Sequence, residues 1–272
     1  MNLDQFYHCQ NEKPLDHLVP GGGLSCILRT ICCIGDSLAS GEFESLDEDG
    51  KKGYHDFYEY SWGQFMAREI GSQVYQFSKG GMTAKEYCES FADTMDFWNV
   101  GKRGQAYILA LGVNDISRAL DPENDLEMGE LTDVDVNDYH NNKPSFIGYY
   151  AQIIQRYKEI QPKAKFFLMT IPRAENCEEA RNALQDQHAR LLYGLAKLFD
   201  NCYVMDFRKY SPVHNDQFRQ AFLLGGHMNA MGYVLTARMV TSYLDYIIRH
   251  HMDDFKQIGF VGTPYHNVSE PW

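Results

Sequence analysis

The segment ICCIGDS (residues 31–37) passes from an apolar run to a polar turn at Gly35. The apolar part begins near Arg29 and has the length of a strand, so Arg29–Ile34 is predicted to be one. Four more apolar runs of similar length follow along the chain: Gln73–Phe77, Gln105–Leu111, Lys165–Ile171 and Cys202–Asp206. Runs of this near-continuous apolar character are typical of strands that are buried on both faces of a sheet.

Amphipathic helical patterns lie between and after these strands: Ser61–Gly71, Thr83–Trp98, Ser145–Pro162, Glu178–Phe199 and Asn229–His251. Strands that alternate with helices imply β-α-β units and a parallel sheet. We therefore predict an α/β fold with a doubly wound parallel sheet of about five strands, formed by residues 29–251. Residues 1–28 are expected to be an N-terminal extension that packs on this domain, and residues 252–272 a C-terminal tail.

The composition argues against several classes of partner. The formal net charge is -12, whereas nucleic acids and anionic membranes attract a basic surface. No apolar run approaches the length of about 18 residues that a membrane span needs. The seven cysteines are odd in number and include no CxxC pair, and the N-terminus lacks a signal-peptide pattern. We therefore expect a cytoplasmic protein with reduced thiols.

Four short polar segments are expected to meet at one edge of the sheet, because sites in doubly wound sheets lie at the carboxyl ends of the strands. These segments are Gly35–Ser37, Ser78–Thr83, Gly112–Asp115 and, before the last helix, Gly225–Asn229. They supply a serine, a glycine pair, an asparagine and a histidine. Each segment alone is common as a turn or a helix cap. Their joint occurrence favours a functional site.

This set of groups suits acyl transfer. A serine hydroxyl such as that of Ser37 is a weak nucleophile until a base takes its proton, and His227 is the obvious base. A tetrahedral intermediate needs hydrogen-bond donors aimed at its oxyanion. The backbone N–H groups of Ser37 and Gly81 and the side-chain amide of Asn114 are the candidate donors.

The segments GDSL, GGMT, GVND and GGHMN resemble, in order, the four sequence blocks of the SGNH hydrolases, also called GDSL-type esterases and lipases. The resemblance covers residues 30–251, and the Gly-x-Asn-Asp block is its most specific element. It implies a flavodoxin-like, three-layer α/β/α sandwich with Ser37 as nucleophile and His227 as base. It also implies an oxyanion hole made by the Ser37 N–H, the Gly81 N–H and the Asn114 side chain.

The fourth block departs from the family pattern Asp-x-x-His, because Leu224 stands where the acid is expected. An acid in that position would fix the tautomer of His227 and stabilise its imidazolium. Three alternatives are open. A backbone carbonyl of residues 223–226 accepts the Nδ1 proton, a displaced acid such as Asp216 or Asp206 takes the role, or the protein is a weak or inactive enzyme.

The substrate is less well defined by the sequence. The segment EFESLDEDGKKGYHDFYEYSW (residues 42–62) is rich in aromatic side chains, which either pack this loop on the domain or line a pocket for a sugar or acyl group. The acidic segment 121–142 is expected to be a solvated loop that shapes one side of the cleft. An acidic rim repels anionic lipids, so a small neutral ester, such as an acetylated carbohydrate, is favoured.

No metal or cofactor is expected, because the sequence has no HExxH motif and no His/Cys cluster at ligand spacing. The leading hypothesis is a serine ester hydrolase that acts on a small-molecule ester through an acyl-enzyme. Two alternatives remain. Leu224 is compatible with a non-catalytic ligand-binding member of the fold, and an acyltransferase would pass the acyl group to a sugar instead of to water. The sequence predicts no particular oligomeric state.

Overall fold

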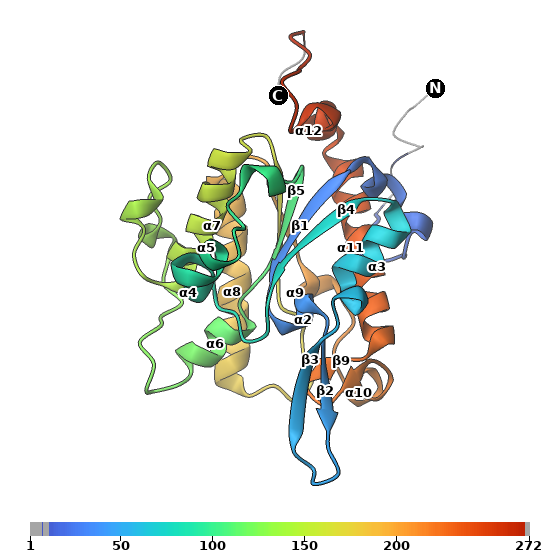
Figure 1. Cartoon of the computed structure of the whole chain (residues 1–272), viewed down its shortest axis with the longest axis vertical. Coiled ribbons are helices and arrows are strands. Elements are labelled where there is room, and N and C mark those ends of the chain that lie inside the picture. Colours follow the sequence, from blue (N-terminus) through green and yellow to red (C-terminus); the bar gives the residue numbers. More distant parts are fainter. Residues whose placement is uncertain (1–6, 8–10, 270–272) are drawn as a thin grey trace.

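The computed structural model describes residue 7 and residues 11–269, and its centre is a five-stranded parallel sheet in the order β4-β1-β5-β6-β7 (Figure 1). The strands are β1 (Thr30–Gly35), β4 (Gln73–Ser78), β5 (Ala106–Ala110), β6 (Lys165–Met169) and β7 (Cys202–Met205). The five predicted strands are thus confirmed to within two residues at each end. The strand order is that of the flavodoxin-like doubly wound sheet, as predicted.

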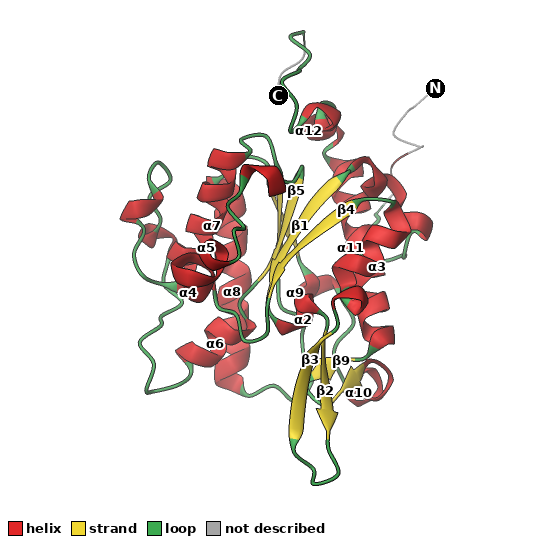
Figure 2. Ribbon diagram, in the orientation of Figure 1, coloured by secondary structure: helices red, strands yellow, loops and turns green. Residues whose placement is uncertain are grey.

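Helices cover both faces of this sheet, which gives the three layers seen in Figure 2. The longer helices are α3 (Trp62–Ile70), α7 (Phe146–Ile160), α8 (Glu179–Leu198), α10 (Asp216–Phe222) and α11 (Ala230–His250). The shorter ones are α2 (Ser37–Ser40), α4 (Ala84–Glu86), α5 (Ala92–Thr94), α6 (Val113–Ala119), α9 (Phe207–Tyr210) and α12 (Met252–Phe255). Helices α3 and α11 lie on one face, whereas α7 and α8 lie on the other.

Two hydrophobic cores result, one on each face of the sheet. Successive side chains of a strand point to opposite faces, so Ile31 and Cys33 of β1 pack toward α3 and α11. Cys32 and Ile34 pack on the opposite side, against α7 and α8. All four are completely buried, which explains why β1 is apolar at consecutive positions.

The segment after Ser37 forms a β-hairpin, β2 (Glu42–Leu46) and β3 (Lys52–Asp56), where the sequence suggested a polar loop. Its turn contains Asp49-Gly50, a dipeptide typical of hairpins, and Gly50 has φ 77°. Figure 1 shows the hairpin projecting beyond the carboxyl edge of the sheet. A second, very short antiparallel pair, β8 (Leu223–Leu224) and β9 (His227–Met228), lies against β2.

Two other segments differ from a simple helix or loop. The predicted helix Thr83–Trp98 consists of α4, a π-helical turn (Tyr87–Phe91) and α5, although its capping box of Thr83 and Glu86 is present. The acidic segment 121–142 contains two 3₁₀ turns and is held on α7, where Asn142 donates to Gln155 Oε1 at 2.9 Å. It is therefore anchored by its own polar side chains.

The N-terminal part of the described chain packs on the same domain. The 3₁₀ segment Pro20–Ile27 contacts α11, and the Leu24 N–H donates to Asp245 at 2.8 Å. Parts of the expected extension and tail lie outside the described residues, namely residues 1–6, 8–10 (with Cys9) and 270–272. Six described cysteines are free thiols. Within the described ranges, no helix is both long enough and apolar enough to cross a bilayer.

Candidate active site

Ser37 lies in a tight turn between β1 and α2. It is the first residue of α2, and the carboxylate of Asp36 caps the helix by accepting the Leu38 N–H at 3.0 Å. The turn has no room for a larger residue at its start, because a Cβ on Gly35 would lie 2.5 Å from Ala39 Cβ. Ser37 therefore lies directly after the carboxyl end of β1.

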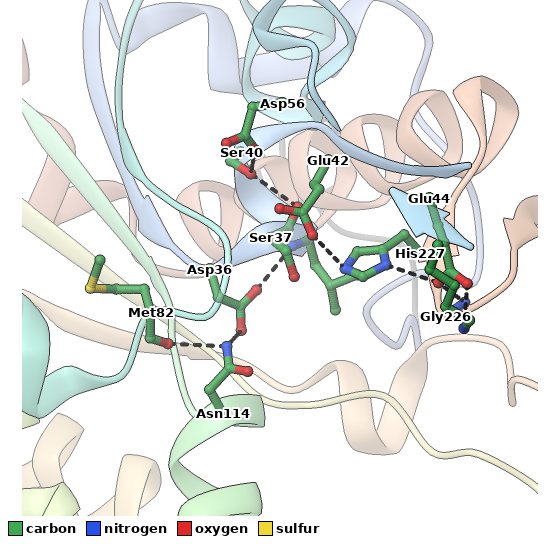
Figure 3. A network of polar contacts seen from close by, with 12 residues as sticks. Asp36, Ser37, Ser40, Glu42, Glu44, Asp56, Met82, Asn114, Gly226 and His227 are labelled. Atoms are coloured by element: carbon green, nitrogen blue, oxygen red, sulfur yellow. Dashed lines mark hydrogen bonds and ion pairs between the residues drawn. The ribbon is translucent and has the colours of Figure 1, made fainter. Parts of the chain in front are cut away.

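Asn114 connects three of the four predicted segments. Its side-chain Nδ2 donates to the carbonyl of Met82 at 3.1 Å and lies 3.4 Å from Asp36 Oδ2 (Figure 3). Met82 follows the glycine pair, and Asp36 precedes the serine. An amide NH₂ has two protons to donate, so Asn114 holds the loop after β4 next to the turn that carries Ser37.

Gly81 is placed to offer its backbone N–H at the same rim. It has φ 75°, a conformation that favours glycine, and no acceptor in the described part of the chain takes its N–H. The loop is fixed just beyond it, because Asp115 Oδ1 accepts the Ala84 N–H at 2.9 Å. The arrangement leaves a donor free beside Asn114.

His227 begins β9, next to the turn of Gly225 and Gly226, and its imidazole lies between two carboxylates of β2 (Figure 3). Its Nε2 is 3.0 Å from Glu42 Oε1, and its Nδ1 is 3.5 Å from Glu44 Oε2. The three side chains are largely shielded from solvent, with 16, 13 and 7% of the side chain exposed for His227, Glu42 and Glu44.

The two acids proposed from the sequence are not in contact with this imidazole. Asp206 is buried and binds Thr170 Oγ1 at 3.0 Å and the Tyr193 hydroxyl at 2.8 Å. Asp216 is exposed at the start of α10. Within residues 11–269, no hydrogen bond or ion pair joins either carboxylate to His227. Both assignments stay predictions from sequence that the geometry of the site does not support.

The sequence interpretation missed Glu42 and Glu44. Residues two apart on a strand point to the same face, so this spacing was a usable signal once the hairpin was recognised. The Asp-Gly dipeptide at residues 49–50 was the cue to that hairpin. Neither cue indicates which partner the carboxylates face, because the contact from Glu44 to Gly226 spans 182 residues of the chain.

An apolar cavity of about 210 Å³ lies beside the serine turn. Its walls include Leu38, Val113, Met169, Ile171 and Phe207. Residues 121–142 contribute nothing to its lining, so the acidic segment does not form the cleft wall expected for it there. In the described ranges, no group of three or more His, Cys, Asp and Glu side chains is arranged to hold a metal ion.

Comparison with protein families gives a match to the GDSL-like Lipase/Acylhydrolase family over residues 33–235. This chain belongs to that family. The matched range begins within β1 and ends within α11, so it includes Ser37, Gly81, Asn114 and His227. No curated protein sequence matches the chain.

Two solved structures illustrate how the family fold is shared. A family two carbohydrate esterase from Clostridium thermocellum, in complex with cellohexaose, is similar with a TM-score of 0.57 at 14% identity, over 89% of this chain and 66% of the other. A carbohydrate esterase family 2 enzyme with a carbohydrate-binding domain from Corynascus thermopiles has a TM-score of 0.52 at 16% identity, over 80% and 66%. At these identities the likeness concerns the fold. The chain spans about two thirds of the length of these two proteins.

Proposed function

We propose that this GDSL-family protein is a serine ester hydrolase with Ser37 as nucleophile and His227 as base. The observation that carries the proposal is the bridge made by Asn114, which binds the loop of Gly81 on one side and the residue before Ser37 on the other. The bridge holds the segments after β1, β4 and β5 together, and these segments carry the hydroxyl and the candidate oxyanion donors. The contact of β9 with α2 further supports His227 as the base, and Ser37 and His227 are both drawn in Figure 3.

The reaction proceeds in two halves. Ser37 Oγ attacks the acyl carbon and gives its proton to His227 Nε2, and the N–H groups of Ser37 and Gly81 hold the oxyanion together with the Asn114 proton that is released from Asp36. Collapse breaks the bond to the alcohol, which leaves with the proton from Nε2. Water then attacks the acyl-enzyme and gives one proton to Nε2, which passes it to Ser37 Oγ as the ester bond to the serine breaks and the acid leaves.

Besides the release of Asn114 Nδ2 from Asp36, this sequence of steps requires a rearrangement at the imidazole. His227 Nε2 lies 3.0 Å from Glu42, yet it is the nitrogen that must take the proton of Ser37. Glu42 is therefore displaced from Nε2 when substrate enters. Burial raises the pKa of Glu42, so leaving this enclosed position relieves an unfavourable desolvation of the carboxylate.

The surroundings support a small acyl or O-acetyl ester, and an ester of a carbohydrate in particular. The apolar cavity next to Leu38 suits an acyl group. The ring of Tyr54, half exposed on the hairpin, is 5.5 Å from that of His227, and aromatic faces of this kind stack on sugars. A net charge of -12 disfavours anionic headgroups.

The proposal is tested by hydrolysis of p-nitrophenyl acetate with wild type, Ser37→Ala and Ser90→Ala. We expect Ser37→Ala to lose roughly 10³-fold or more in kcat, because no other group supplies the nucleophile. The control Ser90→Ala removes an exposed serine of the π-helical turn and should retain the wild-type rate. Equal rates for wild type and Ser37→Ala would contradict the proposal and favour a non-catalytic binding protein. A sugar acceptor that captures the acyl group would favour the transferase alternative.

A further inference from the structure

The carboxylate of Glu44 faces the nitrogen of His227 that a catalytic acid would face. In a serine hydrolase, Nε2 serves the nucleophile, while an acid on Nδ1 fixes the tautomer and stabilises the imidazolium. Glu44 Oε2 lies 3.5 Å from Nδ1. This is an ion-pair separation, longer than a well-formed hydrogen bond.

No competing group occupies Nδ1. Among the described residues this buried nitrogen has no hydrogen-bond partner, so the backbone carbonyls of residues 223–226 do not accept from it. Leu224, at the family's acid position, points into solvent with 47% of its surface exposed. An unpartnered buried polar atom is costly, and Glu44 is the group beside it that relieves this cost.

Glu44 is held in place from two further directions. Its Oε2 accepts the Gly226 N–H at 2.9 Å, and its Oε1 lies 2.5 Å from Lys52 Nζ on the neighbouring strand. The Lys52 ammonium and the Gly226 N–H lower the pKa of Glu44 to about 2. The carboxylate is therefore ionised at every pH at which an esterase is assayed, and its contact with Gly226 ties it to the residue preceding His227.

The strand geometry separates the roles of the two glutamates. Glu42 and Glu44 lie on the same face of β2 because side chains alternate along a strand. Glu42 contacts Nε2 and Glu44 contacts Nδ1. When Glu42 withdraws, Nε2 can accept the proton of Ser37, whereas Glu44 stays in contact with Nδ1.

We propose that Glu44 is the positioning residue for His227 and replaces the acid that the family places at Leu224. The proposal deepens the function argued above and rests on His227 being the base. In the family pattern the acid stands three residues before the histidine. Here the proposed acid is on the hairpin that follows the nucleophile in the sequence.

The test compares kcat and KM for p-nitrophenyl acetate in Glu44→Gln, Glu44→Asp and Lys52→Gln. Glu44→Gln keeps an oxygen for the Gly226 N–H but loses the charge on Nδ1, so we expect kcat to fall about 10²- to 10⁴-fold with KM within a fewfold of wild type. Glu44→Asp should recover at least tenfold over Glu44→Gln. The melting temperature of each variant shows whether the hairpin is intact.

Lys52→Gln separates positioning from a structural role. It removes a partner of Glu44 but leaves the carboxylate on Nδ1, so it should lose less than tenfold in kcat. Glu48→Gln, at the exposed tip of the same hairpin, is the matched control and should behave as wild type. An equal loss in Lys52→Gln and Glu44→Gln would overturn the proposal, because it would show that Glu44 acts only by holding the hairpin.

Two other outcomes are decisive. Wild-type kcat in Glu44→Gln, or a loss confined to Glu42→Gln, would overturn the role of Glu44 while leaving a Ser37-dependent esterase in place. Wild-type activity that is unaffected by Ser37→Ala would instead overturn the proposed function itself. The failure of one proposal is therefore distinguishable from the failure of the other.

Discussion

Two buried carboxylates, Asp36 and Asp115, support the rim of the site at the scale of single residues. Each is exposed by 1% or less. Asp36 accepts the Leu38 N–H and Asp115 accepts the Ala84 N–H. Burial raises the pKa of each to about 7. The charge of Asp36 raises the pKa of Asp115 further, and the charge of Glu42 does the same for Asp36. Both buried carboxylates therefore lower the free energy of unfolding, but they hold the serine turn and the loop of Gly81 in place.

A pH dependence of stability follows from Asp115. Its pKa is higher in the folded chain than the value of 3.8 expected when unfolded, so the folded state binds the proton more tightly. Stability is lost as pH rises from about 4 to about 7. We expect the free energy of unfolding of Asp115→Asn, relative to wild type, to rise by up to about 4 kcal/mol across this window.

Urea unfolding at pH 4, 5, 6, 7 and 8 measures this difference. Ser117→Ala, two residues further along α6, removes a side chain that does not titrate in this range and is the control. Its difference from wild type should be the same at every pH. An Asp115→Asn difference that is equally flat would show that the carboxyl does not titrate in this window.

At the scale of elements, the junction of β5 and α6 determines where Asn114 lies. Gly112 has φ 136° and is backed by His188 of α8, whose Nε2–H donates to the Leu111 carbonyl at 3.0 Å. Burial lowers the pKa of His188 to about 4, so this imidazole is neutral. The close approach of α8 is possible because position 112 has no side chain.

Gly112→Ala should therefore destabilise the fold and displace Asn114. Its Cβ would lie 2.4 Å from His188 Nε2, and alanine is strained at this φ. We expect a loss of about 2–4 kcal/mol in the free energy of unfolding, from overpacking and backbone strain together. The rate of ester hydrolysis should fall as well, because Asn114 lies only two residues after Gly112 and would be displaced with it.

The matched variant is Gly259→Ala, where no heavy atom lies within 4 Å of the added Cβ. It should change stability by no more than about 0.5 kcal/mol. Urea unfolding of both variants under one condition measures the comparison. A Gly112→Ala protein as stable as Gly259→Ala would mean that α8 moves away at little cost. Such a result would contradict the close packing of His188 on Gly112.

At the scale of the whole molecule, the fold and most of the proposed site could be predicted from the sequence. The buried strands are apolar at consecutive positions, and each polar segment follows its strand directly. Local sequence patterns reveal where β1, β4 and β5 end. These strand ends determine where Ser37, Gly81 and Asn114 lie. The parallel sheet then brings these ends together without any long-range information.

The environment of His227 could not be predicted in the same way. It depends on β2 meeting β9, a contact between segments far apart in the sequence, and no local pattern encodes which faces pair. The packing of residues 121–142 on α7 was missed for the same reason. Its many carboxylates suggested a solvated loop, whereas Asp133 accepts hydrogen bonds from Ser145 and Lys143 at the start of α7.

Covalent labelling tests whether Ser37 is the nucleophile. The chain is incubated with a fluorophosphonate, which transfers its phosphonyl group to an activated serine oxygen and releases fluoride, and the modified peptide is located by mass spectrometry. We expect one adduct per chain, on the peptide that contains Ser37, and none in Ser37→Ala. An adduct on another residue that accompanies loss of ester hydrolysis would contradict this role of Ser37.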